Sequence, residues 1–229
     1  PSCPGNNFGT GVLPANPMPH AETVNALRLH FRNWVLRDIA PPPSRYPTLA
    51  DGDLVQANRA ALGFAALPGL RASVPEADFI MPVHDYDWGP QFSAVDGSGV
   101  PTITPPRIRQ VLKMLAPRVD ADGNERGGVP VVLLDAPLGT YLGWNVTAAG
   151  FHKDQICNYV GGMIPFARSA AQRRASQDSR LSLEERYGNH DGYVQAVRQA
   201  AQRAVQQGFL LEADAAVLLR QAQDSAVLR

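Results

Sequence analysis

The chain has 229 residues with 21 basic and 21 acidic side chains, so its formal net charge is zero. Hydrophobic residues make up 45% of the sequence, which is enough for one substantial buried core in a single domain. Basic residues do not cluster and no apolar stretch is long enough to cross a bilayer, which argues against a nucleic-acid partner and against a membrane span.

The front of the chain is expected to be rich in turns, because most of its 20 prolines and 20 glycines precede residue 165. Residues 1–19 are expected to form a loop. From Pro19 to Ile39, apolar side chains recur at three- and four-residue spacing, which predicts an amphipathic helix with one buried stripe. The stripe consists of Val24, Leu27, Phe31, Trp34 and Val35. Prolines 41–43 end this helix.

Residues 41–105 are expected to be mostly irregular. Short strands are predicted at Leu54–Gln56 and Ala77–Met81, and His84–Pro90, which contains Trp88, is predicted to be a loop. So long an irregular stretch is often functional or wrapped over a partner surface.

A β-hairpin is expected within residues 111–134, because apolar runs flank an Asp-Gly pair. Val111–Val119 would lead into the turn and Val129–Leu134 would return from it. Helix is the alternative for Ile108–Leu115, since several of its residues favour helices. The turn, Asp120–Glu125, alternates oxygen-bearing side chains as a calcium loop does, but it lacks the final glutamate of an EF-hand. We therefore interpret it as a turn and expect no metal.

The tail after residue 165 is expected to be helical. Residues 165–177 should be at least partly helical, and Ser182–Glu185 has the pattern of a capping box. A helix is predicted over His190–Gln207, stopped by Gly208, and a second over Leu211–Val227. The last two helices should pack as a helical hairpin.

Candidate functional side chains are few. A nucleophile elbow of the Gly-x-Ser-x-Gly type is absent, as are phosphate-loop, dinucleotide and zinc motifs, so no cofactor is expected. His20 precedes a helix, as a triad base often does, but it follows a proline-rich run; it is either a candidate base or an ordinary loop residue. Trp88, Tyr141 and Trp144 lie in Gly/Pro-rich loops, where aromatic rings either line a substrate cleft or anchor the loop to its core.

The two cysteines, Cys3 and Cys157, have three alternatives. They pair with each other, stay as buried thiols, or pair with cysteines elsewhere.

Several segments resemble, in order along the chain, a bacterial group of α/β-hydrolase domain-containing proteins. The matching segments are Asn16-Pro17, Trp34-Val35, Pro41–Pro47, Leu49–Gly52, Val119–Glu125, Pro137–Asn145, Pro165–Ala167 and Ser182–Gly188. They span nearly the whole chain and resemble the C-terminal region of such proteins, without their catalytic half.

The resemblance implies an α/β fold class, namely the C-terminal part of an α/β-hydrolase fold with a loop-rich extension. Residues 1–40 would be the end of the hydrolase core, comprising a loop and the last helix of the sheet. Residues 41–164 would be the extension, with its β-hairpin near 111–134, and residues 165–229 a helical tail on the same domain. The first helix would then need a parallel sheet, absent from these residues, to cover its apolar stripe.

The resemblance also implies that the complete protein is a serine hydrolase acting on ester or related acyl bonds, with its catalytic triad upstream of residue 1. This chain alone would not be catalytic. Its partners would be an N-terminal segment or chain of the same protein and a small ester-like substrate. The group suggests an exported protein, periplasmic or secreted, which favours a disulfide between Cys3 and Cys157. The alternative function is a non-catalytic binding or interaction module.

Overall fold

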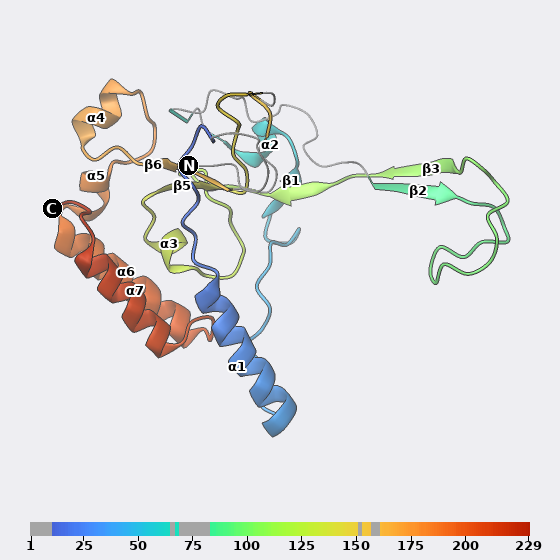
Figure 1. Ribbon diagram of the computed structural model, residues 1–229, viewed down its shortest axis with the longest axis horizontal. Helices are drawn as coiled ribbons and strands as arrows, with labels where there is room; N and C mark the ends of the chain where they lie inside the picture. The colour runs from blue at the N-terminus through green and yellow to red at the C-terminus, as the bar shows by residue number, and fades with distance from the viewer. Residues whose placement is uncertain (1–10, 65–66, 69–82, 151–152, 157–160) are drawn as a thin grey trace.

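Seven helices and six strands make up the part of the chain that the computed structural model describes, residues 11–64, 67–68, 83–150, 153–156 and 161–229 (Figure 1). The helices are α1 Ala21–Arg37, α2 Arg59–Leu62, α3 Val132–Asp135, α4 Ala170–Ala175, α5 Leu183–Tyr187, α6 His190–Gln206 and α7 Glu212–Asp224. The strands are β1 Leu54–Gln56, β2 Val83–Asp87, β3 Arg107–Leu112, β4 Leu115–Pro117, β5 Gly139–Leu142 and β6 Gly162–Pro165.

The two C-terminal helices pack against each other, as predicted, and they form the main hydrophobic core among the described residues. Helices α6 and α7 lie side by side, and the short helix α3 packs against α6 (Figure 1). The Asn189 side chain caps α6 by accepting a hydrogen bond from the Gly192 amide at 2.9 Å, and Gly208 follows the helix with φ of +81°. The buried core residues are Val132, Ala136, Tyr193, Val194, Val197, Ala200, Ala201, Ala204, Leu210 and Ala222.

The predicted capping box is confirmed at the start of α5. The Ser182 hydroxyl accepts from the Glu185 amide at 3.3 Å, and the Glu185 carboxylate accepts from the Ser182 amide at 2.9 Å. Hydrogen bonds from the Ser182 hydroxyl and amide, and then from Arg173, lower the pKa of Glu185 to about 2. This short helix therefore begins at a residue that its sequence alone identifies.

A buried ion pair joins the helical tail to the β5–β6 sheet. Both Asp178 and Arg180 are buried, and their side chains are 2.6 Å apart. The Arg180 guanidinium also donates to the Thr140 hydroxyl at 2.8 Å and to the Ile164 carbonyl at 2.9 Å. Burial would raise the pKa of Asp178, but hydrogen bonds from the Arg180 side chain and amide hold it below its usual range. Strand β5, which lies within the Pro137–Asn145 run, is held buried by these contacts.

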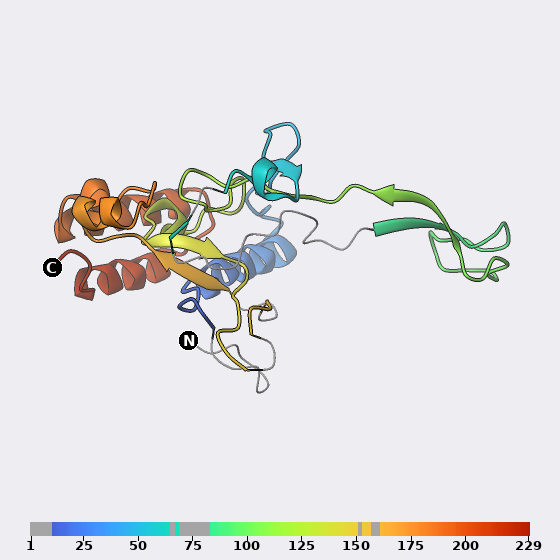
Figure 2. The same cartoon turned by 90° about the horizontal axis from the view of Figure 1, so that it is seen from above.

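Strands β2 and β3 form a two-stranded antiparallel ribbon that projects away from the helices (Figures 1 and 2). The sequence predicted a loop at His84–Pro90, and this was wrong for the part that lies in β2. Strand β2 pairs with β3 in a register that places Asp87 opposite Arg107, and the Asp87 carboxylate accepts from Arg109, which lies 22 residues further along the chain. The strand therefore depends on a non-local contact. A row of rings runs along the ribbon: centroids are 5.5 Å apart for His84 and Tyr86, and 5.8 Å for Tyr86 and Trp88.

The predicted hairpin at 111–134 was wrong in its pairing and in its second strand. Strand was the correct choice over helix for Ile108–Leu115, but β3 pairs with β2 and β4 pairs with β1. Residues 132–135 form α3, because Val132 is buried in the core beside α6 and tertiary packing overrides local strand propensity. What remains of the hairpin is an isolated bridge between Val119 and Glu125 around the Asp-Gly turn.

Strand β1 coincides with the predicted Leu54–Gln56. The predicted strand at Ala77–Met81 lies outside the described residues. In the described part of the chain, all strand pairs are antiparallel and two-stranded, so α1 has no parallel sheet beneath it there.

Candidate functional site

The first helix turns its predicted apolar stripe outward. Exposed fractions are 64% for Phe31, 51% for Trp34 and 65% for Val35, and Val24 and Leu27 are also exposed. The helix itself forms where it was predicted, but the expected burial of the stripe does not occur among the described residues. The C-terminal half of α1 extends beyond the neighbouring elements (Figure 1). The stripe is therefore an uncovered apolar surface along one helix, a feature that typically marks an interface.

The opposite side of α1 faces the protein. Ala26 is completely buried, the His30 ring bonds the Gly208 carbonyl at 2.8 Å, and Asn25 donates to Asp214 at 3.2 Å. Glu22 Oε2 and Asn33 Oδ1 are buried, and neither has a hydrogen-bond partner within the described ranges. Buried polar atoms are normally paired. The helix thus packs by its small and polar side, while its apolar side is exposed in the part of the chain that the structure describes.

The described histidines are not arranged as triad bases. His20 is exposed at the N-cap of α1 and makes no side-chain capping bond. His30 bonds a backbone carbonyl, His84 bonds the Tyr86 hydroxyl at 2.9 Å, and His190 bonds the Val227 carbonyl at 2.8 Å. In residues that the structure describes, no histidine is hydrogen-bonded to a serine hydroxyl or to a carboxylate, which is the arrangement that a serine nucleophile needs.

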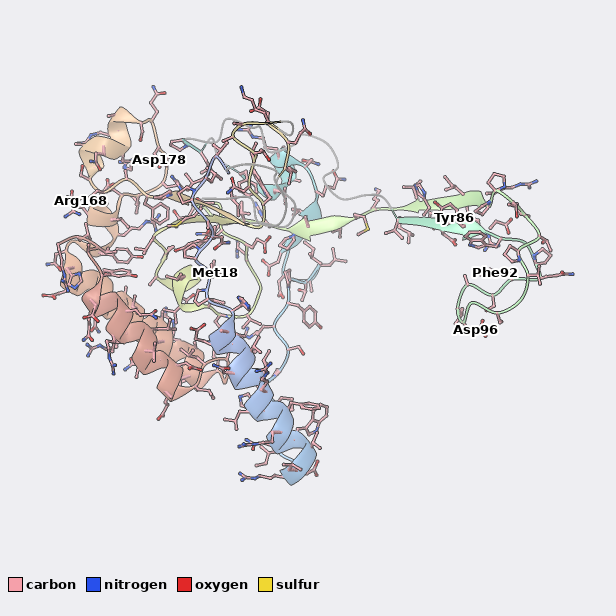
Figure 3. All side chains as sticks on the ribbon, viewed as in Figure 1. Met18, Tyr86, Phe92, Asp96, Arg168 and Asp178 are labelled. Carbon is pink, nitrogen blue, oxygen red and sulfur yellow. The ribbon has the colours of Figure 1, made fainter. Side chains whose placement is uncertain are left out.

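The three aromatic cleft candidates do not come together. Tyr141 is buried in β5, where its hydroxyl accepts from the Leu138 amide at 3.0 Å and burial raises its pKa to about 12. Trp144 is half-buried and packs against a small apolar cluster that includes Leu13 and Ile164. Trp88 follows β2 on the projecting ribbon. Figure 3 shows the ribbon residues Tyr86 and Phe92 at the opposite end of the molecule from Asp178, near β6. A shared cleft role for the three stays a prediction.

The turn at Asp120–Glu125 is closed by the Asp120 carboxylate, and the Asp122 carboxylate pairs with Arg186 on α5. The Asp120 carboxylate accepts from the Asp122 and Asn124 amides, both at 2.9 Å. Among the described residues, no group of three or more His, Cys, Asp and Glu side chains is placed to share a metal ion. Over the same residues, no helix has the length and apolar character needed to cross a bilayer. Cys3 and Cys157 lie outside the described residues.

Sequence reasoning missed a polar pocket of about 370 Å³ beside this turn. Its walls come from Arg45, the loop at residues 124–130, α3 and the end of α6. Although Glu125 as a residue is exposed, its carboxyl group lies among enough protein atoms that desolvation raises its pKa. The only signal in the sequence was the charged Glu125-Arg126 pair followed by two glycines, which by itself predicts no more than a loop.

Residues 4–220, nearly the whole chain, match a family model described as an alpha/beta hydrolase domain. Neither the curated proteins nor the solved structures contain a match to the chain.

Proposed function

Since this chain belongs to the alpha/beta hydrolase domain family, we propose that it is the C-terminal portion of a serine hydrolase acting on ester or related acyl bonds. Membership of the family supports hydrolase chemistry in general. The serine nucleophile, the ester substrate and the position of the triad upstream of residue 1 belong to the proposal.

The exposed stripe of α1 carries this proposal. A helix that buries Ala26 and leaves Phe31, Trp34 and Val35 in water gains little from its apolar residues unless another surface covers them. We assign that surface to the sheet of the hydrolase core, with α1 as the last helix on it. A serine on the core would attack the acyl carbonyl, a histidine would accept its proton, and backbone amides would stabilise the oxyanion.

The chemical part of the proposal is tested on the full-length protein with a fluorophosphonate probe and peptide mapping. The probe is expected to label one serine upstream of residue 1 and none within residues 1–229. Labelling of Ser98, or of any other serine in this chain, would contradict the proposal. A screen of p-nitrophenyl esters from acetate to palmitate should show hydrolysis; a protein that neither hydrolyses them nor reacts with the probe would favour the non-catalytic binding module.

The packing part is tested separately, by replacing Trp34 in the full-length protein. If the stripe lies on the sheet, Trp34→Ala should lower the free energy of unfolding by about 3–5 kcal/mol. The matched control, Arg28→Ala on the same helix, should change it by less than about 0.5 kcal/mol. Equal small effects from both variants would show that the core does not cover α1.

A further inference from the structure

The pocket beside the Asp120–Glu125 turn contains both acidic and basic groups, and most of them already have partners. Asp120 bonds the amides of its own turn. Asp135 accepts from Arg203 at 3.0 Å, and Arg126 lies 3.9 Å from Asp53. Each of these groups therefore has at least one partner within the protein, although the contact of Arg126 with Asp53 is longer than a hydrogen bond.

Three polar side chains in the wall remain available. Among the residues that the structure describes, Arg45, Glu125 and Gln207 have no side-chain hydrogen bond or ion pair. They come from three separate segments: the stretch after the proline run, the loop before α3, and the residue that follows α6. The pocket therefore presents one free cation, one free anion and one neutral amide within the described part of the chain.

We propose that this pocket binds a small zwitterion, whose ammonium group pairs with the Glu125 carboxylate and whose carboxylate pairs with the Arg45 guanidinium. Charge-assisted hydrogen bonds of this kind are the stronger ones in proteins. The Gln207 amide supplies a neutral donor or acceptor between them. The volume of about 370 Å³ lies at the small end of the range for small-molecule sites. The site does not depend on the proposed hydrolase activity.

The state of Glu125 gives the binding a definite pH dependence. Desolvation raises the pKa of this carboxyl group, which disfavours its ionised form in the empty pocket. A bound ammonium group favours the ionised form of Glu125, so binding at a pH near the pKa of this group releases a proton. Affinity should therefore fall as the pH drops through the pKa of Glu125.

The test is isothermal titration calorimetry on the 229-residue chain with β-alanine and 4-aminobutyrate, and with propionate and propylamine as single-charge controls. At least one zwitterion is expected to saturate, with an affinity about tenfold above either control, which corresponds to one additional charge-assisted hydrogen bond. Failure of both zwitterions to saturate, or equal binding of the single-charge probes, would overturn the proposal.

Two variants locate the site. Glu125→Gln should weaken zwitterion binding about tenfold and remove the fall in affinity as the pH drops through the pKa of Glu125. Arg45→Gln should weaken binding by a similar factor while that fall remains. Glu184→Gln, at an exposed position on α5, should leave binding unchanged. Binding that is unaffected by both pocket variants would place the ligand elsewhere and refute the assignment. Because Glu125 and Arg45 have no side-chain partners among the described residues, neither variant removes a described contact.

Discussion

Helices α1 and α6 are each 17 residues long, and they place their apolar faces in opposite environments. Helix α6 buries its apolar face against α7 and α3. Helix α1 exposes its stripe and packs by the side that carries Ala26. A period of three to four residues therefore predicts a helix and its apolar stripe in both cases, but it does not identify what the stripe contacts.

The two helices differ in burial because different segments follow them in the chain. Helix α6 ends at Gln206 and α7 begins at Glu212, so a short turn that contains Gly208 brings an apolar partner alongside. Helix α1 is followed by a left-handed residue, Asp38, and a proline run that leads away. Its contacts with the rest of the described protein include the buried Ala26 and polar side chains such as His30.

The largest loss of stability is expected from a substitution of Arg180, which joins the helical tail, the region that contains α6, to the β5–β6 sheet. Arg180→Ala leaves Asp178 as a buried carboxylate without its partner, which should lower the free energy of unfolding by about 3–5 kcal/mol in urea titrations. Arg220→Ala, at an exposed position on α7, should change it by less than about 0.5 kcal/mol. If the two variants were equally stable, the ion pair would not hold the tail to the β5–β6 sheet.

The same substitution in the two helices tests the comparison directly. Val197→Ala removes methyl groups from a side chain that is 2% exposed and should cost about 1–3 kcal/mol in the 229-residue chain. Val35→Ala changes a side chain that is 65% exposed and should cost less than about 0.5 kcal/mol. A large cost at Val35 in this chain would mean that α1 is covered from within residues 1–229, and it would remove the main support for the proposed function.

The N-termini of the two helices differ in the same way. Asn189→Ala removes the side chain that accepts from Gly192 at the start of α6, and should cost about 1 kcal/mol. His20→Ala at the start of α1 removes no capping bond and should cost less than about 0.5 kcal/mol. Thermal unfolding of both variants provides the measurement. If the melting temperature fell as much in His20→Ala as in Asn189→Ala, His20 would have a stabilising role that its exposed position does not suggest.

The elements that could be predicted from the sequence are those fixed by local chemistry. The capping box at Ser182, the stop at Gly208 and the paired C-terminal helices depend on residues within a few positions of one another. Strand β2 and helix α3 depend on distant partners, so their local sequence was misleading. The pocket could not be predicted for the same reason, because Arg45, Glu125 and Gln207 meet only in the folded chain.

The smallest effect concerns acid stability and the cap of α5. The pKa of Glu185 is about 2 in the folded protein against 4.5 ordinarily, so its ionised form stabilises the fold above pH 4.5. This contribution is lost as the pH falls from 4.5 towards 2. In urea titrations at a series of pH values, Glu185→Gln should therefore reduce the loss of unfolding free energy between pH 4.5 and 2. Glu184→Gln, at the neighbouring exposed glutamate, should leave that loss unchanged. If the free energy of unfolding fell equally with pH in the wild type and in Glu185→Gln, the charge of Glu185 would not contribute to stability. The capping box would then stabilise α5 through its hydrogen-bond geometry alone, and charge would not be part of the difference between this region and α1.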